Sequence, residues 1–491
     1  MVFSKPVLQY KLYVEWGEFM NKKMFMAGGR VERKEAWLYC MGIYGQNLAC
    51  ALMMNWFMNF CTDVLYVDGI IIGLVLGIAR VWDSVNDPVI GTMIDRHRFK
   101  NGEKFRPLLR ATPIFIGIII VLLFTDWGFQ GDMPKAIYIL ILYLAYDMIF
   151  TVQDVSMWSM TSVMTDVPAE REKVSQWGRI VAAFGFGMVG VFPTVMDALM
   201  QQGVAKKHIY FGAAVVFGVG GMLLSILSAN AKERIQASEE ATAASFKENL
   251  KMLFENKIVM LVLLGNILNG LSLTVPAAYF FEHKVTATFM GQEMGGLTVM
   301  TMFYAFAYMF TGAGMFFTTM LSKKLGGMRN VLIAANLLTV VMRVAAFFVG
   351  FEGNRIWISM ILFGIGSIPG SMFGIARTAL WGDSIDYMEW KTGKRAEAIT
   401  FAAQTFCDKI ANALNTVIAG ALLTILAYDA EAIQAGAPLS DAFNTWIWPL
   451  FMLGPAIGAA LYIIPLLFIN YPKELKEQVT AELKERRGEI E

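Results

Sequence analysis

The chain has 491 residues, of which 56% are hydrophobic and 16% are charged, with a formal net charge of +1. A soluble protein carries about 25% charged residues, so this composition excludes an ordinary soluble protein, and the balanced charge gives no reason to expect a nucleic-acid partner. The apolar residues come in many runs of about 20, which as helices cross about 30 Å of hydrocarbon. We therefore predict an all-α, polytopic membrane protein.

The first 34 residues are basic and contain no apolar core followed by a small-residue cleavage site, so we expect a cytoplasmic segment rather than a cleaved signal peptide. Twelve apolar segments follow, at 35–60, 67–95, 108–127, 134–165, 174–200, 208–230, 257–282, 293–321, 328–350, 355–380, 396–428 and 441–470. They predict twelve transmembrane helices in two six-helix bundles, 35–230 and 257–470, around a central pathway. A cytoplasmic linker is expected at 231–256 and a cytoplasmic tail at 471–491.

Lysine and arginine are concentrated in the loops on one side of the predicted membrane. The loop after the second segment, RHRFKNGEKFRPLLR, carries six of them, whereas the next loop, TDWGFQGDMPKA, carries one. Basic loops remain in the cytoplasm. Both ends of the chain fall on that side as well, so we expect both termini to be cytoplasmic.

The first segment contains a polar patch, Tyr44, Gln46 and Asn47, within an apolar run. Contact with a ligand and hydrogen bonding between helices are nearly equal interpretations of this patch.

The second segment carries a charged cluster of Arg80, Asp83, Asn86 and Asp87. An ionised side chain at mid-membrane costs about 2.5–3.5 kcal/mol, and this cost is recovered only by facing a protein interior, by pairing or by binding an ion. Residues 80, 83 and 87 share one helix face. Two carboxylates with a neighbouring amide oxygen suit sodium, and a desolvated carboxyl would suit a proton. The structural alternative is an ion pair between Arg80 and Asp83.

The fourth segment places Thr151, Asp154 and Trp158 on one face. A carboxylate that accepts hydrogen bonds from sugar hydroxyls, beside an indole that covers the apolar face of the ring, is typical of sugar sites. The structural alternative is a buried Asp154 paired with an arginine, with Trp158 in packing.

Further charges occur deep in other segments. Arg179 lies on the fifth segment and Lys409 on the eleventh, where Asp408 points about 100° away from Lys409 and need not be its partner. Arg343 and Arg377 lie nearer segment ends, and we expect their side chains to extend toward the membrane surface.

Catalytic motifs are absent from the sequence. It has three histidines and contains no HExxH, P-loop or GxSxG motif. Its four cysteines have no metal-ligand spacing, which favours free thiols. We therefore expect no enzyme and no cofactor, and an ion gradient as the source of energy.

Three stretches resemble the glycoside–pentoside–hexuronide:cation symporters, the melibiose permease group of the major facilitator superfamily. RVWDSVNDPVIGTMIDRHRFKNGEKFRPLL resembles their second helix and following loop, TVQDVSMW their fourth helix, and GDSIDYMEWKTGKRAEAITFAAQTFCDK their loop 10–11 and eleventh helix. The resemblance covers nearly the whole chain. It implies a monomeric transporter with the major facilitator fold in a bacterial inner membrane.

The resemblance also implies roles for individual residues. The cation-site residues are Asp83, Asp87, Asn86 and Thr151, a set that favours sodium and leaves lithium or a proton open. The sugar-site residues are Asp154, Trp158 and Arg179, and Lys409 matches a lysine close to both sites. From charge alone, we expect Arg80 and Lys409 to balance the two acids in part and to couple the two solutes. The cytoplasmic gate comprises Gly91, Asp95 and Arg96 of the first half and Asp383, Asp386, Glu389, Lys394 and Arg395 of the second.

Two departures from melibiose permease bear on the substrate. Gln46 and Asn47 stand where that protein has a Lys-Asp pair on its first helix, and Phe373 lies near the place of a helix X tryptophan. With Tyr44, these residues complete the predicted substrate site. The loss of an aspartate while Arg179 is kept makes the pocket less acidic, which favours a hexuronide or another anionic sugar over melibiose.

We therefore expect a secondary transporter that couples entry of a cation, first of all sodium, to uptake of a glycoside, oligosaccharide or hexuronide. Two alternatives remain: a sodium-coupled lysolipid carrier of the same fold, and a non-transporting membrane sensor that binds sugar.

Overall fold

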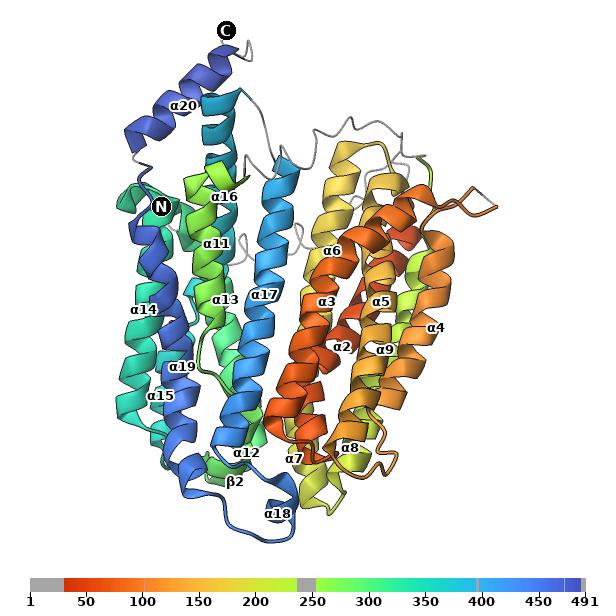
Figure 1. The fold of residues 1–491 in the computed structure, drawn as a ribbon, viewed down its shortest axis with the longest axis vertical. Helices are drawn as coiled ribbons and strands as arrows, with labels where there is room; N and C mark the ends of the chain where they lie inside the picture. The colour runs from red at the N-terminus through yellow and green to blue at the C-terminus, as the bar shows by residue number, and fades with distance from the viewer. Residues whose placement is uncertain (1–30, 101, 236–252, 394–396, 472, 487–491) are drawn as a thin grey trace, which may run out of the picture.

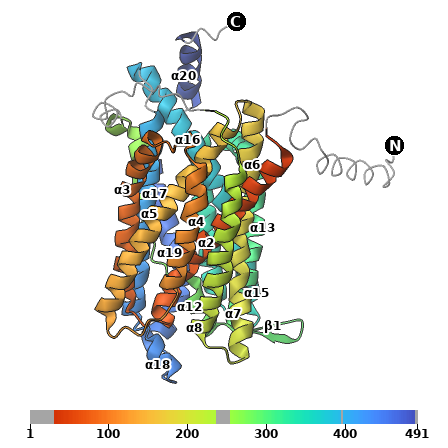
Figure 2. The same ribbon diagram turned by 90° about the vertical axis from the view of Figure 1, so that its right-hand side faces the viewer.

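The computed structural model describes residues 31–100, 102–235, 253–393, 397–471 and 473–486, and these form a helical bundle with one short hairpin (Figures 1 and 2). Ten helical segments in this part of the chain are long and apolar enough to cross a membrane. They are built from α3 (Gly69–Arg96), α4 (Arg106–Leu123), α5 (Asp132–Met164), α6 (Pro168–Met188), η1 (Val189–Val191), α7 (Phe192–Gln201), α8 (Lys206–Ala213), η2 (Ala214–Val219), α9 (Gly220–Ser225), η3 (Ile226–Asn230), α13 (Gly296–Leu325), α14 (Met328–Val349), α15 (Arg355–Ile365), α16 (Pro369–Thr392), α17 (Glu397–Ile425) and α19 (Asp441–Leu467).

The first and seventh predicted spans complete the set. The first is α2 (Arg33–Asp63), a helix of 31 residues. The seventh is broken, contrary to the continuous helix predicted at 257–282: α11 (Lys257–Gly270) ends, an extended stretch follows, and α12 (Ala277–Lys284) begins after Pro276. Proline has no N–H to donate and disfavours helical backbone at the residue before it, which accounts for the break.

The two ends of the bundle differ. The antiparallel pair β1 (Ala287–Phe289) and β2 (Gln292–Met294) and the short helix α18 (Ala430–Gln434) lie at one end, which we call the hairpin end. The opposite end carries α20 (Lys473–Arg486) and is called the α20 end (Figure 2). The hairpin was not predicted.

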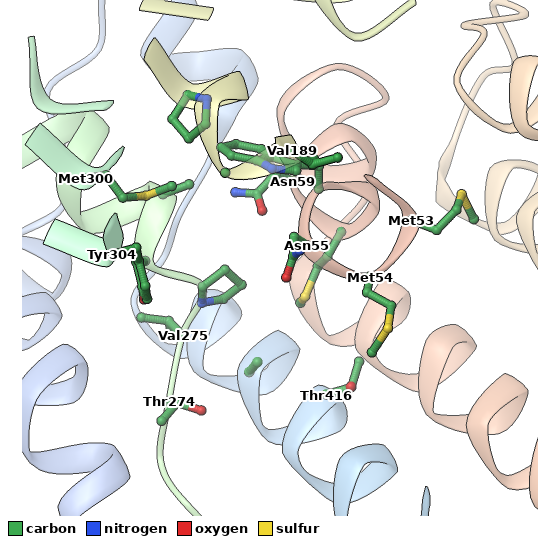
Figure 3. Close-up of a pocket in the computed structure, with 18 of the residues that line it drawn as sticks. Met53, Met54, Asn55, Asn59, Val189, Thr274, Val275, Met300, Tyr304 and Thr416 are labelled. Atoms are coloured by element: carbon green, nitrogen blue, oxygen red, sulfur yellow. The ribbon is translucent and has the colours of Figure 1, made fainter. Parts of the chain in front are cut away.

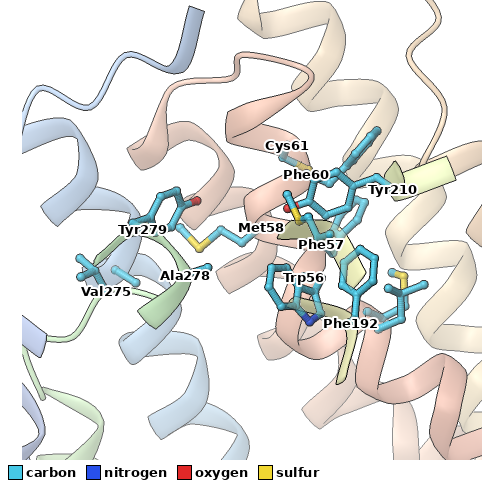
Figure 4. Packing of buried hydrophobic residues seen from close by; sticks show 14 of the residues in the cluster. Trp56, Phe57, Met58, Phe60, Cys61, Phe192, Tyr210, Val275, Ala278 and Tyr279 are labelled. Atoms are coloured by element: carbon cyan, nitrogen blue, oxygen red, sulfur yellow. The ribbon is translucent and has the colours of Figure 1, made fainter. Parts of the chain in front are cut away.

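Aromatic side chains fill the core near the hairpin end of α2 (Figure 4). Trp56 meets Phe192 edge to face with ring centroids 5.0 Å apart, and Phe60 meets Tyr210 in the same way at 5.6 Å. All four side chains are buried. Offset and edge-to-face pairs of this kind contribute about 0.5–1.5 kcal/mol each beyond their buried area, so they hold α2 firmly to α7 and α8.

The closest contact between the two halves of the chain is the seam between α3 and α17. Glycines make it possible: a Cβ on Gly420 of α17 would lie 2.2 Å from the carbonyl oxygen of Gly69, and one on Gly69 would lie 2.6 Å from the carbonyl oxygen of Gly420. Small residues allow helix backbones in membranes to approach this closely. The seam runs from the hairpin end toward the middle of the bundle, where the charged residues of α3 begin.

A buried ion-pair network joins the halves at the hairpin end. Lys206 of α8 lies 3.0 Å from Asp63 of α2 and 2.5 Å from Glu282 of α12. The hydroxyl of Tyr428, which follows α17, donates to Asp63 Oδ1 at 3.0 Å, and Gln434 of α18 donates to the Asp63 carbonyl oxygen at 2.9 Å. This network, which we did not predict, closes the hairpin end.

Candidate functional site

Lys409 of α17 lies between the two aspartates of α3. Its Nζ is 2.9 Å from Asp83 Oδ2, forms a second ion pair with Asp87 Oδ2, and donates to the Asp83 carbonyl oxygen at 3.3 Å. Asp83 and Asp87 face the same side because they are one helical turn apart. One ammonium group therefore bridges both carboxylates and links the two halves of the chain.

Thr151 of α5 completes this cluster. Its hydroxyl lies 3.1 Å from Asp87 Oδ1 and 3.4 Å from Asp83 Oδ1, so it is placed to donate to either. The structural alternative for Arg80, an ion pair with Asp83, is wrong, because Asp83 pairs with Lys409 instead. Asn86 lies on α3 beside the pair, buried, and its Nδ2 has no partner in the described residues.

The oxygen set suits a monovalent cation. The Oδ2 atoms of both aspartates contact the Lys409 ammonium, and their Oδ1 atoms face the Thr151 hydroxyl. Carboxylate and hydroxyl oxygens are ligands for hard cations. The described residues contain no group of three or more His, Cys, Asp or Glu side chains that could hold a metal ion. Two carboxylates and a hydroxyl beside an ammonium form a set that a monovalent cation can join by displacing the ammonium.

Asp154 of α5 accepts a hydrogen bond from the first span, α2. Gln46 Nε2 donates to Asp154 Oδ1 at 2.6 Å, and Gln153 Nε2 lies 3.4 Å from Gln46 Oε1. The polar patch on α2 therefore takes part in a helix–helix hydrogen bond. That bond holds the carboxylate predicted for sugar binding, so the two interpretations of Gln46 are compatible.

Trp158 and Arg179 lie together. The Arg179 guanidinium sits 5.5 Å from the centroid of the Trp158 ring, a cation–π distance. Arg179 is exposed, and it has no hydrogen bond or ion pair within the described residues. The alternative in which Asp154 pairs with an arginine is not what the structure shows, because Asp154 bonds to Gln46.

The remaining predicted substrate residues are less closely joined to this group. Asn47 Nδ2 donates to the carbonyl oxygen of Ile43 on its own helix at 2.9 Å, and Tyr44 is half-buried on the same helix. Phe373 packs on Tyr462, with ring centroids 4.9 Å apart, within the second half. Nothing in the described chain brings Phe373 into contact with Asp154 or Trp158.

Of the predicted gate residues, only some can be placed. Asp383 Oδ2 accepts from Lys476 Nζ at 2.6 Å, so its partner is α20. Asp386 and Glu389 lie on α16 near the α20 end, and Gly91 lies on α3 with open space around it. The side chains of Asp95 and Arg96, and the whole of Lys394 and Arg395, lie outside the described residues.

The prediction that Arg343 and Arg377 extend to the membrane surface is wrong. Arg377 forms a two-fold ion pair with Asp408, at 2.8 and 3.1 Å, because α16 continues to Thr392 and places Arg377 well inside the helix. Arg343 lies 4.6 Å from the centroid of the Phe363 ring and donates to a main-chain oxygen of α19 at 3.3 Å. Asp408 is indeed not the partner of Lys409.

One buried acid was missed. Asp147 of α5 is 6% exposed, and its Oδ2 has no partner within the described chain. It precedes Thr151 by one helical turn and Asp154 by two, so helical spacing within the run YLAYDMIFT could have placed it on the same face.

Comparison with known proteins extends this picture. Residues 38–473 match the family described as "MFS/sugar transport protein". The isoprimeverose transporter of Lactiplantibacillus pentosus is 24% identical over 465 residues, 93% of this chain and 92% of the relative. The inner membrane symporter YicJ of Escherichia coli K12 is 29% identical over 434 residues, 86% and 88% of the two chains.

Solved structures share the fold at low identity. The nucleoside transporter NupG superposes with a TM-score of 0.59 at 12% identity, covering 89% of this chain and all of that one. A D-xylose-proton symporter superposes with a TM-score of 0.56, also at 12% identity, covering 89% and 98%. The predicted resemblance and the transporter fold are confirmed, and this chain belongs to the MFS/sugar transport protein family as a multi-pass secondary transporter rather than an enzyme.

Proposed function

We propose that this protein is a sodium-coupled symporter of a glycoside, oligosaccharide or hexuronide. The observation that carries the proposal is the Lys409 ammonium held between Asp83 and Asp87 at the contact of α3 with α17. In this state the internal cation satisfies both acids. A sodium ion that takes its place, with Thr151 as a further ligand, releases Lys409 and changes the contact between the halves.

Sugar binding is coupled to this exchange through α5. Thr151 and Asp154 lie one turn apart on that helix, so one face of α5 contacts both proposed sites. If the cation raises the affinity for sugar, thermodynamic linkage requires sugar to raise the affinity for the cation by the same factor. The loaded protein then alternates access as the two bundles, 35–230 and 257–470, rock against each other.

Two observations support an anionic substrate. Arg179 lies exposed over Trp158 without a carboxylate partner within the described residues, so it is available to an acid group. A relative from Salmonella typhimurium, 24% identical over 472 residues, carries the name putative 2,3-dihydroxypropane-1-sulfonate exporter, and that named solute combines hydroxyls with one acid group. A hexuronide has the same two features.

We further propose a monomer in a bacterial inner membrane, with the α20 end and both termini in the cytoplasm. The ion-pair network then closes the hairpin end toward the outside. The basic loop at 97–105 lies at the α20 end, which supports this orientation by the distribution of positive charge.

The test is a thermal-shift screen of the purified protein against glycosides, hexuronates and lysolipids, with sodium or choline as the cation. Ligand binding stabilises the folded state, so we expect a stabilising sugar whose effect requires sodium. The same sugar should then accumulate in proteoliposomes under an inward sodium gradient. Stabilisation by lysolipids alone, or binding of sugar without any flux, would contradict the proposal.

A further inference from the structure

A cavity of about 390 Å³ lies between the two halves, separate from the residues proposed for sugar binding (Figure 3). Its walls include Asn55 and Asn59 of α2, while Gln46, which holds Asp154, is nine residues earlier on the same helix. Nine residues of helix span about 14 Å. The cavity therefore lies well toward the hairpin end from Asp154, just short of the Asp63 network.

Two asparagines of α2, Asn55 and Asn59, make part of the cavity lining polar. Asn59 is 1% exposed, and its Oδ1 has no hydrogen-bond partner in the described chain. Figure 3 shows Asn55 and Asn59 directed from α2 toward the wall that carries Met300 and Tyr304. A buried amide oxygen without a partner costs about 1–3 kcal/mol, a cost that a hydroxyl of a bound solute would remove.

Arg80 places a positive charge in the wall of the cavity. It is the only charged residue among the described residues that line the cavity, and it forms no hydrogen bond through its guanidinium and no ion pair in that part of the chain. Asp83, one turn away, is engaged by Lys409. A guanidinium that faces a cavity with no bound carboxylate is suited to a carboxylate or sulfonate group, which it binds through paired N–H donors.

Each half of the chain contributes an irregular part of a helical segment to this cavity. The 3-10 turn η1, which joins α6 to α7 within one continuous helix, contributes Val189 and Gly190, and the break between α11 and α12 contributes Thr274 and Pro276. In transporters, discontinuous helices expose main-chain groups at solute sites between repeats. Here the helix break of the second half and the tightened turn of the first half lie at one cavity, whose volume lies in the range of about 300–1,000 Å³ of small-molecule sites.

We propose that this cavity is a second solute site, which holds a small polyhydroxylated anion with its acid group on Arg80 and a hydroxyl on Asn59. The inference rests on the proposed function only for the class of solute. The site lies between the closed hairpin end and the cation cluster, so an entering solute would occupy it before reaching Asp154. Among the described residues no carboxylate lines it, so we expect its binding not to require sodium.

The test measures equilibrium binding of radiolabelled D-glucuronate to the purified full chain in choline buffer, without sodium. We expect saturable binding that Arg80→Gln and Asn59→Leu each weaken by about tenfold, as the loss of a hydrogen bond to a charged or buried group does. Asn59→Leu removes an unpartnered buried oxygen, so the variant is expected to fold. The matched control is Asn336→Leu, which alters a buried asparagine that bonds only within α14 and lies outside the cavity lining.

Three outcomes would overturn the inference: no binding of glucuronate without sodium, unchanged binding in either cavity variant, or equal weakening in the Asn336→Leu control. None of these bears on the sodium-dependent binding and flux that test the proposed function. Conversely, a protein that binds glucuronate at Arg80 but never transports it under a sodium gradient would retain the second site and lose the proposed function.

Discussion

The Lys409 ammonium lies 2.9 Å from Asp83 Oδ2 and also pairs with Asp87, so a single side chain of the second half satisfies both acids of the first. Removing one acid takes away a negative charge and at least one oxygen ligand from the proposed cation site. We predict that Asp87→Asn, and separately Asp83→Cys, abolishes sodium-driven accumulation of solute in membrane vesicles, while solute exchange across the membrane persists. Normal accumulation in both variants would overturn the assignment of the cation site, and Glu293→Gln on the exposed hairpin is the matched control.

Replacing Lys409 should raise the affinity for sodium, whereas replacing either aspartate should lower it. In Lys409→Gln no internal cation competes for the two carboxylates, and carboxylates left without a partner away from water are strongly unfavourable. We expect the apparent affinity for sodium to rise about tenfold, equivalent to about 1.4 kcal/mol. The measurement is sodium-dependent thermal stabilisation of the purified variant. An affinity for sodium that is unchanged or lower would show that Lys409 does not occupy the place of the cation.

Asp154 is the carboxylate on which the proposed sugar site depends. Asp154→Ala removes the acceptor for sugar hydroxyls and leaves Gln46 to bond with Gln153. We predict loss of sodium-dependent sugar binding and of uptake, with an unchanged helical circular-dichroism spectrum. Sodium-dependent sugar affinity equal to that of the parent protein would refute this role for Asp154.

The sequence predicted much of this site because charge within a membrane is so costly. Asp83, Asp87 and Asp154 each lie within a long, mostly apolar segment, and helical spacing places the first two on one face. Residue spacing within one helix does not identify an ion-pair partner on another helix. The pairs Lys409 with Asp83 and Arg377 with Asp408 depend on how α3, α16 and α17 pack.

Other features were missed although the sequence held a signal for them. The glycines at 69, 73 and 77 recur every fourth residue, a spacing that favours close helix packing. Pro276 marks the break between α11 and α12. The network of Lys206 with Asp63 and Glu282 joins segments far apart along the chain near span ends, where single charges are common, so no local pattern distinguished it.

The seam between α3 and α17 can be tested with a pair of glycine substitutions. In Gly420→Ala the new Cβ would lie 2.2 Å from the carbonyl oxygen of Gly69. Relieving this overlap requires the two helix backbones to move apart, which costs free energy. We expect a loss of about 1–3 kcal/mol in the free energy of unfolding, as for an overpacked core, measured as a lower midpoint of thermal unfolding. Gly374→Ala is the control: no atom lies within 4 Å of the place its new methyl group would take, so its midpoint should stay the same or rise. Equal midpoints for the two variants would contradict the close seam.

The C-terminal helix α20 is docked on α16, whereas the sequence analysis predicted only a cytoplasmic tail at 471–491. Glu482 accepts from Trp390 Nε1 at 2.6 Å and from Gln478 Nε2 at 2.9 Å. The hydrogen bond from Gln478, and then that from Trp390, lowers the pKa of Glu482 below its ordinary value. Because both hydrogen bonds favour the charged form, the contribution of Glu482 to helix α20 and to its contact with Trp390 is fully present above the ordinary glutamate pKa of about 4.3 and is lost as the pH falls through the lowered pKa.

We therefore predict that the main-chain amides of residues 473–486 lose protection from hydrogen exchange on acidification below about pH 4.3, after correction for the intrinsic pH dependence of exchange. In Glu482→Gln the neutral amide can still accept from Trp390, but it has no charge to lose. Its α20 amides should therefore be less protected at neutral pH and show a smaller change on acidification. An identical acid transition in the parent protein and in Glu482→Gln would assign the pH dependence to another group, with the ion pair between Lys476 and Asp383 as the next contact to test.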